Sequence, residues 1–231
     1  MPIKIAGIHQ PNYLPWPGYF HKIMRSDVFI ILDNVDFQQG NSKSITSRTK
    51  IKGANGETLL SVPVKHTEDK LLRNIQIDNS QTWAKKHIKS IQFSYTKAPY
   101  FKTYYPLMEK ILLESCSGLF ELNYRIIKEV CSILEIPTQL LVASEMQIEE
   151  EDRNLRIVKL CASAGANAYL CGKGGRSYMD ENVFTDNGIE VMYTAFNPPE
   201  YPQLHGAFLP GLSVLDALMN TGKAGVCELI R

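Results

Sequence analysis

The sequence carries almost no net charge: 25 Lys and Arg residues balance 24 Asp and Glu residues, for a formal net charge of +1. Proteins that coat DNA or RNA neutralise phosphates with clustered cations, so this balance argues against a dedicated nucleic-acid surface. It also argues against a polybasic membrane anchor. The longest purely apolar stretch, residues 28–32, is strand-sized. We therefore expect neither nucleic acid nor membrane as a partner.

Cysteine pairs and metal-binding motifs are also missing. The five cysteines include no CxxC pair, and their odd number fits no disulfide framework. HExxH and paired-His spacings, which would indicate a zinc site, do not occur. Residues 1–7 (MPIKIAG) lack the apolar region of a signal peptide. These absences predict reduced thiols in a cytoplasmic protein, with no metal site and no tightly bound cofactor.

The order of apolar runs and amphipathic stretches is typical of an α/β protein. Residues 3–8 form an apolar run, and the loop at 9–18 contains three prolines that exclude regular structure. A short helix is expected near 19–24. The apolar run at 28–32 lies between Asp27 and Asp33 and predicts a strand buried on both faces. This strand–loop–helix–strand opening favours a parallel sheet.

The rest of the chain has three parts with different patterns. Strand-like pieces at 44–51, 58–64 and 74–77 indicate a β-rich insertion at about 37–78, with a turn at Asn55-Gly56. Helices are expected at 83–95, 104–113 and 119–134, within a helical segment at about 82–135. Strands at 139–143, 168–171 and 190–193 then alternate with helices at 154–163, 183–187 and 214–219. The sequence predicts one α/β domain over 1–231, a Rossmann-like and mostly parallel sheet flanked by helices.

Polar residues that could carry chemistry follow the predicted strands. In open α/β sheets ligands bind beyond the carboxyl ends of the strands. The first strand would deliver His9 and Gln10, and the second Asp33, with Asn34 and Asp36 just beyond. The strand at 139–143 would deliver Ser144 and Glu145, and the strand at 168–171 the segment Gly172, Lys173, Gly174, Gly175 and Arg176. If these strands are parallel neighbours, an imidazole, a carboxylate, cations and a glycine loop meet at one edge. This predicts an enzyme.

Each candidate has a structural alternative. His9 could be bonded to its own loop, and Asp33 could cap the next segment as an Asx-turn. The GKGG segment is neither a Walker A loop nor a GxGxxG fingerprint, so it is either a plain turn or an anion-binding loop. Arg48 alternates with two lysines along a strand, which also suits a solvated edge. No GxSxG elbow occurs, and Cys171 is the thiol nearest the glycine loop.

Several long motifs resemble the WbqC-like family. They include IHQPNYLPWPGYFHKI, SDVFIILDNVDFQ, GANAYLCGKGGRSYM and FLPGLSVLDALMNTG, and the resemblance extends from about residue 5 to residue 222. It implies a bacterial role in O-antigen or other surface-polysaccharide biosynthesis, or in specialised metabolism. It also implies a transferase that moves an aminoacyl or acyl group from a thioester donor, a carrier protein or CoA with its phosphopantetheine arm, to an amine such as an amino sugar.

The resemblance adds binding candidates at the positions that match its motifs. The positions expected to bind substrate are Gln10, Tyr13, Tyr19, Lys22, Gln38, Arg48, Gly172, Lys173, Gly175, Arg176 and Tyr178. At position 171 the family carries a small residue such as Ser, so the resemblance gives Cys171 little support as a nucleophile. No metal is implied.

Three functions follow from these candidates. In acyl transfer the acceptor amine must lose a proton, so His9 would be the base. Asp33 would orient the imidazole, stabilise the imidazolium or fix the acceptor ammonium, and backbone N–H groups of the glycine loop would hold the oxyanion. In nucleotidyl transfer a loop histidine would bind a triphosphate, as in cytidylyltransferase-like proteins. The second histidine usual there, three residues later, is missing from His9-Gln10-Pro11-Asn12. A non-catalytic module that binds a sugar nucleotide or carrier protein is the third.

Overall fold

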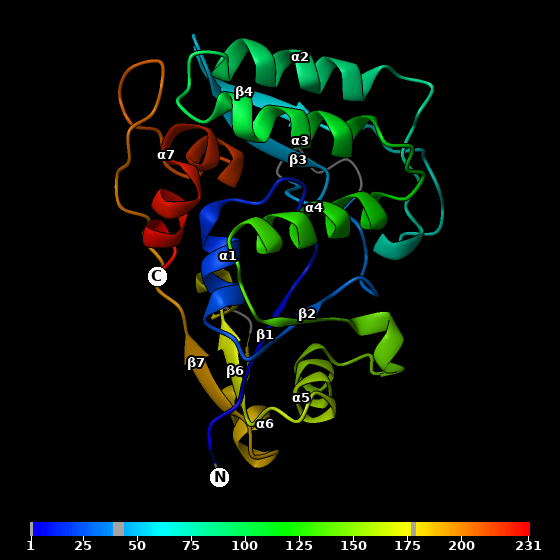
Figure 1. Cartoon of the computed structure of the whole chain (residues 1–231). Coiled ribbons are helices and arrows are strands. Elements are labelled where there is room, and N and C mark those ends of the chain that lie inside the picture. The colour runs from blue at the N-terminus through cyan, green and yellow to red at the C-terminus, as the bar shows by residue number, and fades with distance from the viewer. Residues whose placement is uncertain (1, 39–43, 177–178) are drawn as a thin grey trace. The chain divides into compact units, whose positions relative to one another are not determined.

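The computed structural model describes residues 2–38, 44–176 and 179–231. The chain divides into two compact units (Figure 1). Unit 1 comprises Met1–Gln10, Gly18–Asn34 and Ile136–Asn197, and unit 2 comprises Pro11–Pro17, Val35–Glu135 and Pro198–Arg231. The single domain over 1–231 stays a prediction, because compactness does not show whether the units unfold together.

Unit 1 is built on a five-stranded parallel sheet. Its strands are β1 (Ile5–His9), β2 (Val28–Ile31), β5 (Gln139–Val142), β6 (Ala168–Cys171) and β7 (Glu190–Tyr193). Their order is β5-β2-β1-β6-β7, and each neighbouring pair is parallel. The chain therefore starts at the central strand, builds outward to β5, and crosses to the other side of β1 with β6. This confirms the Rossmann-like α/β prediction.

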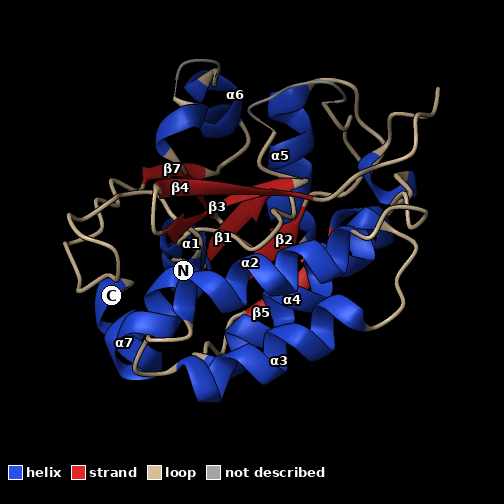
Figure 2. Cartoon of the chain, turned by 90° about the horizontal axis from the view of Figure 1, so that it is seen from above, coloured by secondary structure: helices blue, strands red, loops and turns tan. Residues whose placement is uncertain are grey.

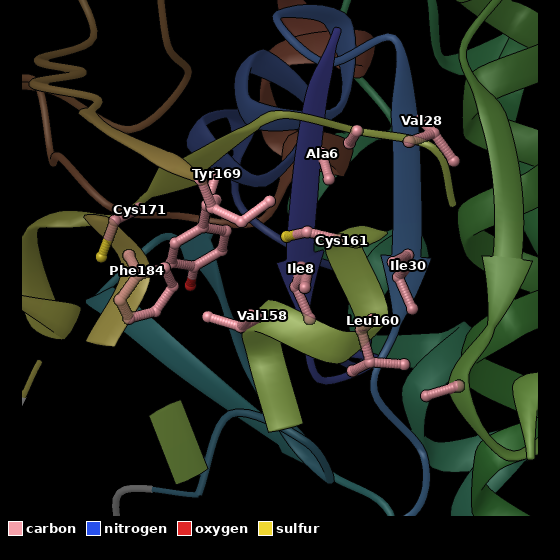
Figure 3. Close-up of a cluster of buried hydrophobic side chains, with 13 residues drawn as sticks. Ala6, Ile8, Val28, Ile30, Val158, Leu160, Cys161, Tyr169, Cys171 and Phe184 are labelled. Atoms are coloured by element: carbon pink, nitrogen blue, oxygen red, sulfur yellow. The ribbon is translucent and has the colours of Figure 1, made fainter. Parts of the chain in front are cut away.

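One side of the sheet forms a continuous apolar core. Alternate residues of neighbouring strands, such as Ile8, Ile30 and Tyr169, point to the same face because side chains alternate along a strand. They pack with Val158 of α5 (Arg153–Ser163) and Phe184 of α6 (Glu181–Asp186), and Figure 3 shows these side chains meeting. All four residues of β2 are buried, as the apolar run predicts.

The helices of unit 1 begin where the sequence supplies a cap. Helix α1 (Pro17–Met24) starts on proline, whose missing N–H needs no partner in the first turn. The carboxylate of Asp152 accepts from the Leu155 N–H at 2.8 Å and caps α5. Asp180 likewise accepts from the Asn182 N–H at 3.1 Å and caps α6. In the part of the chain that the structure describes, no helix is long and apolar enough to cross a membrane.

Unit 2 contains the β-rich insertion in a smaller form than predicted. Strands β3 (Arg48–Gly53) and β4 (Gly56–Ser61) form an antiparallel hairpin, with the Asn-Gly pair at its turn and Gly56 at φ 100°. The strand expected at 74–77 is wrong: this segment follows the 3-10 turn η1 (Leu72–Asn74) and makes only single bridges, Val64↔Ile77 and Gln76↔Gly118. The apolar residues of segment 74–77 pack in the core although they do not form a β-ladder with another strand.

Four helices complete unit 2 (Figure 2). They are α2 (Trp83–Tyr95), α3 (Phe101–Leu113), α4 (Leu119–Ile133) and α7 (Val214–Leu229). The predicted ends of α2 are correct. Helix α7 runs past the predicted end at 219, but Gly222 interrupts it at φ 66°, where a Cβ would lie 2.7 Å from the Tyr100 ring. The apolar pattern changes at this kink, which explains why the sequence did not predict the second half of α7.

A buried polar network joins β3 to the segment before α7. The ammonium of Lys52, 1% exposed, donates to the carbonyl oxygens of Ala207 at 2.6 Å and Gly206 at 3.0 Å. The carboxylate of Asp216 accepts from the hydroxyls of Tyr95 and Tyr201, each at 2.8 Å. Burial raises the pKa of Asp216, although both hydroxyls oppose the shift. Through these two hydrogen bonds, Asp216 acts as a structural anchor within unit 2.

Candidate active site at the switch point of the sheet

The strand order of unit 1 predicts where a ligand binds. In doubly wound sheets the site lies at the carboxyl ends of the strands where the order reverses. That point lies between β1 and β6, so His9, Cys171 and Gly172 are at its edge. The pairing of β1 with β2 runs to His9↔Ile31, whereas its recorded pairing with β6 ends at Gly7↔Leu170. The last residues of β1 therefore keep only one strand neighbour.

The imidazole of His9 has a defined tautomer. Its Nδ1 lies 2.9 Å from the carbonyl oxygen of Gln10. A carbonyl oxygen only accepts, so Nδ1 carries the proton and Nε2 carries a lone pair. The ring packs edge-on against Tyr19 at a centroid distance of 5.1 Å, and the Tyr19 hydroxyl donates to the same Gln10 carbonyl at 3.2 Å. Gln10 therefore acts here through its backbone carbonyl, which accepts hydrogen bonds from both His9 and Tyr19.

His9 is neutral at physiological pH. Burial and, to a smaller extent, the charge of Lys22 lower its pKa to about 4, although the hydrogen bond to Gln10 opposes both. In the described residues no partner is recorded for Nε2. His9 as a whole residue is half-buried at the sheet edge, so a ligand that binds there could use this lone pair. The geometry makes His9 a neutral proton acceptor.

Lys22 is a buried cation beside His9. It is 5% exposed, and its Nζ donates to the Ile8 carbonyl of β1 at 2.7 Å and lies 5.6 Å from the ring centroid of Tyr169 on β6. It thus bridges the two strands at the switch point. Burial lowers its pKa to about 8, while Cys171 and Cys161 act in the opposite direction. Such a perturbed group at a strand edge is typical of functional sites.

Asp33 lies at the end of β2 but has a different partner from the one expected. Its two carboxylate oxygens accept from the backbone N–H of Ser144 at 2.9 Å and from the Ser144 hydroxyl at 2.6 Å. Ser144 belongs to the 3-10 turn η2 (Ala143–Met146) that follows β5. Asp33 therefore ties β2 to the end of β5, and the orienting partner recorded for His9 is Gln10.

The glycine segment after β6 forms the 3-10 turn η3 (Lys173–Gly175). The N–H of Gly175 donates to the Gly172 carbonyl at 2.9 Å, so this donor is already used. The guanidinium of Arg176 lies 5.0 Å from the ring centroid of Tyr193, the last residue of β7. Only the backbone of Lys173 is described, and Tyr178 lies outside the described residues.

Neither the backbone conformation nor the packing at position 172 requires a glycine. Its φ of −77° and ψ of 162° are extended backbone that any residue adopts. A Cβ at this position would meet no atom within 4 Å. Open space above a strand-end glycine at the switch point is what a close ligand needs.

Cys171 has the environment of a structural thiol. It is 1% exposed, and its Sγ donates to the Gly172 carbonyl at 3.3 Å. Burial raises the pKa of this thiol although Lys22 opposes the shift. A protonated, buried thiol is a poor nucleophile, so the structure argues against a covalent intermediate here.

Two further polar atoms lie at this sheet edge: one belongs to Asn34, which the sequence placed just beyond the second strand, and the other to Thr194, which sequence reasoning missed. Asn34 Oδ1, after β2, and Thr194 Oγ1, after β7, are buried and have no hydrogen-bond partner in the described structure. Buried oxygens without partners are costly. Asn34 lies within the family motif SDVFIILDNVDFQ, whereas Thr194 stands in none of the quoted motifs, so only the strand order could have found Thr194.

The other predicted binding residues lie in unit 2. The Tyr13 hydroxyl is 2.9 Å from His87 Nδ1, and Tyr13 is 1% exposed, so this contact anchors the loop. Burial lowers the pKa of His87 to about 4. Tyr13 and Arg48 line one pocket of about 260 Å³. Gln38 is exposed and is the last described residue before position 44.

Sequence comparison assigns the chain to a family. The model of the WbqC-like protein family matches residues 10–228. The chain belongs to the WbqC-like protein family. A protein of Mycobacterium tuberculosis (strain ATCC 25618 / H37Rv) named "Uncharacterized protein Rv1507c" is 34% identical over 224 residues, which is 95% of each chain. No solved structure matches.

The family match includes residues of both units. It contains β6, Gly172 and the pocket residues of this WbqC-like protein, whereas β1 (Ile5–His9) lies just before the matched region. Across residues 2–38, 44–176 and 179–231, no group of three or more His, Cys, Asp or Glu side chains has a metal-binding arrangement. All five cysteines are free.

Gly172→Val tests whether the switch point is a ligand site. The variant should fold with an unchanged or slightly higher free energy of unfolding, by up to about 1 kcal/mol, because the backbone is extended and the unfolded chain loses freedom. Its Cβ and methyl groups would enter the open space, so activity or ligand affinity should fall at least ~10-fold. Urea unfolding and activity measured on one preparation check both.

The matched control is Gly174→Val, two residues along in the exposed turn, where a Cβ also meets no atom within 4 Å. It should change neither quantity appreciably. Equal activity in the wild type and in Gly172→Val would show that no ligand binds against position 172.

Proposed function

We propose that this WbqC-like protein is a biosynthetic transferase that moves an aminoacyl or acyl group from a thioester to an amine. The donor would be a phosphopantetheine thioester on a carrier protein or CoA, and the acceptor a small molecule such as an amino sugar. The observation that carries the proposal is the neutral His9 at the switch point, whose Nε2 has no recorded partner among the described residues.

The reaction needs one proton transfer that this imidazole can make. The amine nitrogen attacks the thioester carbonyl carbon, and its proton passes to His9 Nε2 as the C–N bond forms. The C–S bond then breaks, and the leaving thiolate takes the proton back to become a thiol. The oxyanion that forms next to the ring stabilises the imidazolium, which offsets the low pKa of His9.

The glycine segment supports the donor side of the proposal. Open space over Gly172 lets a thioester approach the backbone. The Gly175 N–H is already bonded to Gly172, so Gly175 is not proposed as an oxyanion donor. Arg176 follows on the same segment and would supply positive charge for a phosphate-bearing donor, and Lys173 stays a candidate from the sequence alone.

The same geometry ranks nucleotidyl transfer below acyl transfer. A histidine that binds a triphosphate is favoured when it carries a charge, whereas His9 stays neutral above a pH of about 4. The ammonium of Lys22 is buried against the Ile8 carbonyl and faces two thiols. These two groups suit a proton transfer better than a phosphate cradle.

A product assay tests the proposal. The full chain is incubated with aminoacylated carrier protein or aminoacyl-CoA and with amino-sugar nucleotides, and the products are detected by mass. Transfer predicts a new amide whose mass equals the acceptor plus the acyl group minus one hydrogen, together with one free thiol. Release of pyrophosphate from CTP or ATP without any amide would replace the proposal by nucleotidyl transfer.

A further inference from the structure

Unit 2 contains a pocket that the proposed transfer chemistry does not use. Its volume is about 260 Å³, below the roughly 300–1,000 Å³ of pockets for drug-sized molecules. Trp16, Ile45 and Leu59 supply an apolar wall and are 37%, 54% and 54% exposed. Large apolar side chains with this exposure, gathered around one hollow, indicate a surface that a small apolar group can cover.

A buried acceptor lies in the wall of this pocket. Asn12 is 3% exposed, and its Oδ1 has no hydrogen-bond partner in the part of the chain that the structure describes. An amide oxygen removed from water without a donor is costly. A ligand with an N–H group would supply the missing donor.

The pocket is also lined by an arginine for which the described residues show no carboxylate partner. Arg48 donates through Nε to the Ser61 hydroxyl at 3.2 Å, and no ion pair is recorded for it in residues 2–38, 44–176 and 179–231. Lys50 lines the same pocket, but its Nζ is 2.7 Å from the Glu57 carboxylate. Arg48 is therefore the group that would bind an anion, because a guanidinium holds a carboxylate through two parallel bonds.

We propose that this pocket binds a small carboxylate with an apolar body and an N–H donor, the chemistry of an N-acylated hydrophobic amino acid. The carboxylate pairs with Arg48, the N–H donates to Asn12 Oδ1, and the apolar side chain covers Trp16, Ile45 and Leu59. The three features are independent of the switch point, so the proposal does not depend on the transfer reaction.

The probe is N-acetyl-L-phenylalanine, added to the full chain. The sequence has two tryptophans, and only Trp16 lines the pocket, while the Trp83 indole donates to Asn79 at 3.1 Å. In ¹H–¹⁵N spectra the Trp16 indole signal should shift with ligand and the Trp83 signal should not. Calorimetry then gives the dissociation constant, expected at about 1 mM or below.

Changes to the ligand and to the protein separate the three features. The methyl ester removes the charge, the N-methyl derivative removes the donor, and N-acetylglycine removes the apolar side chain. Each should bind at least ~10-fold more weakly. Arg48→Gln should lose a similar factor, whereas the matched variant Lys50→Gln should bind nearly as wild type does because Glu57 already holds that charge.

Two results would overturn the proposal. One is no shift of the Trp16 signal with any probe. The other is a shift that persists at equal affinity for the ester or for Arg48→Gln. Because the readout is binding alone, a failure here leaves the transfer assay untouched, and a failure of that assay leaves this pocket untouched.

Discussion

Replacing His9 by Gln is expected to lower the rate of acyl transfer by roughly 10²- to 10⁴-fold, the usual contribution of a general base. The glutamine amide can still donate to the Gln10 carbonyl that holds the imidazole at 2.9 Å. It cannot take a proton from the amine. The loss should therefore appear in kcat, while donor binding changes little. Initial rates of thiol release, with product mass as a check, measure the effect.

The matched control is His66→Gln, which changes an exposed loop histidine in the other unit. Its rate should equal that of the wild type. Circular dichroism and urea unfolding of all three proteins show whether the fold is kept. A His9→Gln protein that is folded and as active as the control would exclude His9 as the base.

Replacing Lys22 by Met is expected to leave the protein at least as stable at pH 7. The pKa of Lys22 falls from an ordinary value of 10.5 to about 8, which corresponds to about 3 kcal/mol of cost for the buried ammonium. Losing its bond to the Ile8 carbonyl removes about 1–3 kcal/mol. The two effects nearly cancel or favour the variant.

The lowered pKa of Lys22 also predicts how the stability difference between the wild type and Lys22→Met changes with pH. The folded protein holds the Lys22 proton less tightly than the unfolded chain does, so the stability from a neutral amine is present above pH 10.5 and is lost as pH falls through about 8. Wild-type stability should therefore rise relative to the variant between pH 8 and 10.5. Free energies of unfolding in urea at pH 7, 8, 9 and 10 measure the difference.

Lys4→Met is the control, because Lys4 is exposed and also donates to a backbone carbonyl, that of Ala164, at 2.7 Å. It should follow the wild-type pH profile. If Lys22→Met is several kcal/mol less stable at pH 7, the ammonium serves the fold. A cation kept at a cost to stability is instead typical of a functional group.

Sequence patterns were sufficient to predict most of the fold. Apolar runs bounded by charged or turn residues predicted β2 and β6 almost to the residue, because a strand buried on both faces leaves a continuous signal. The bounds of the partly exposed edge strand β7 were also predicted. The amphipathic stripe of α2 did the same for a helix. Segment 74–77 failed because short apolar segments can fill a core without pairing as a strand.

The candidate site was predicted only in part. The chain order alone indicated that strand ends would carry His9 and Gly172, and the parallel order places both strands at the switch point. For Asp33 and Ser144 the sequence predicted a shared sheet edge but not their hydrogen bonds, because the two residues are 111 positions apart. The buried states of Lys22 and Asn12 were equally hidden, since burial depends on packing between segments distant in the sequence.

The acid–base state of His9 can be measured without any substrate. Long-range ¹H–¹⁵N spectra of the ring nitrogens, recorded from pH 8 to pH 4 on wild type and Lys22→Met, report both tautomer and pKa. We expect an Nδ1–H tautomer that titrates at about 4 in the wild type and at a higher pH in the variant, because the ammonium no longer opposes the imidazolium. A wild-type histidine 9 signal that titrates near 6.5, or carries its proton on Nε2, would contradict the neutral proton acceptor on which the proposed transfer rests.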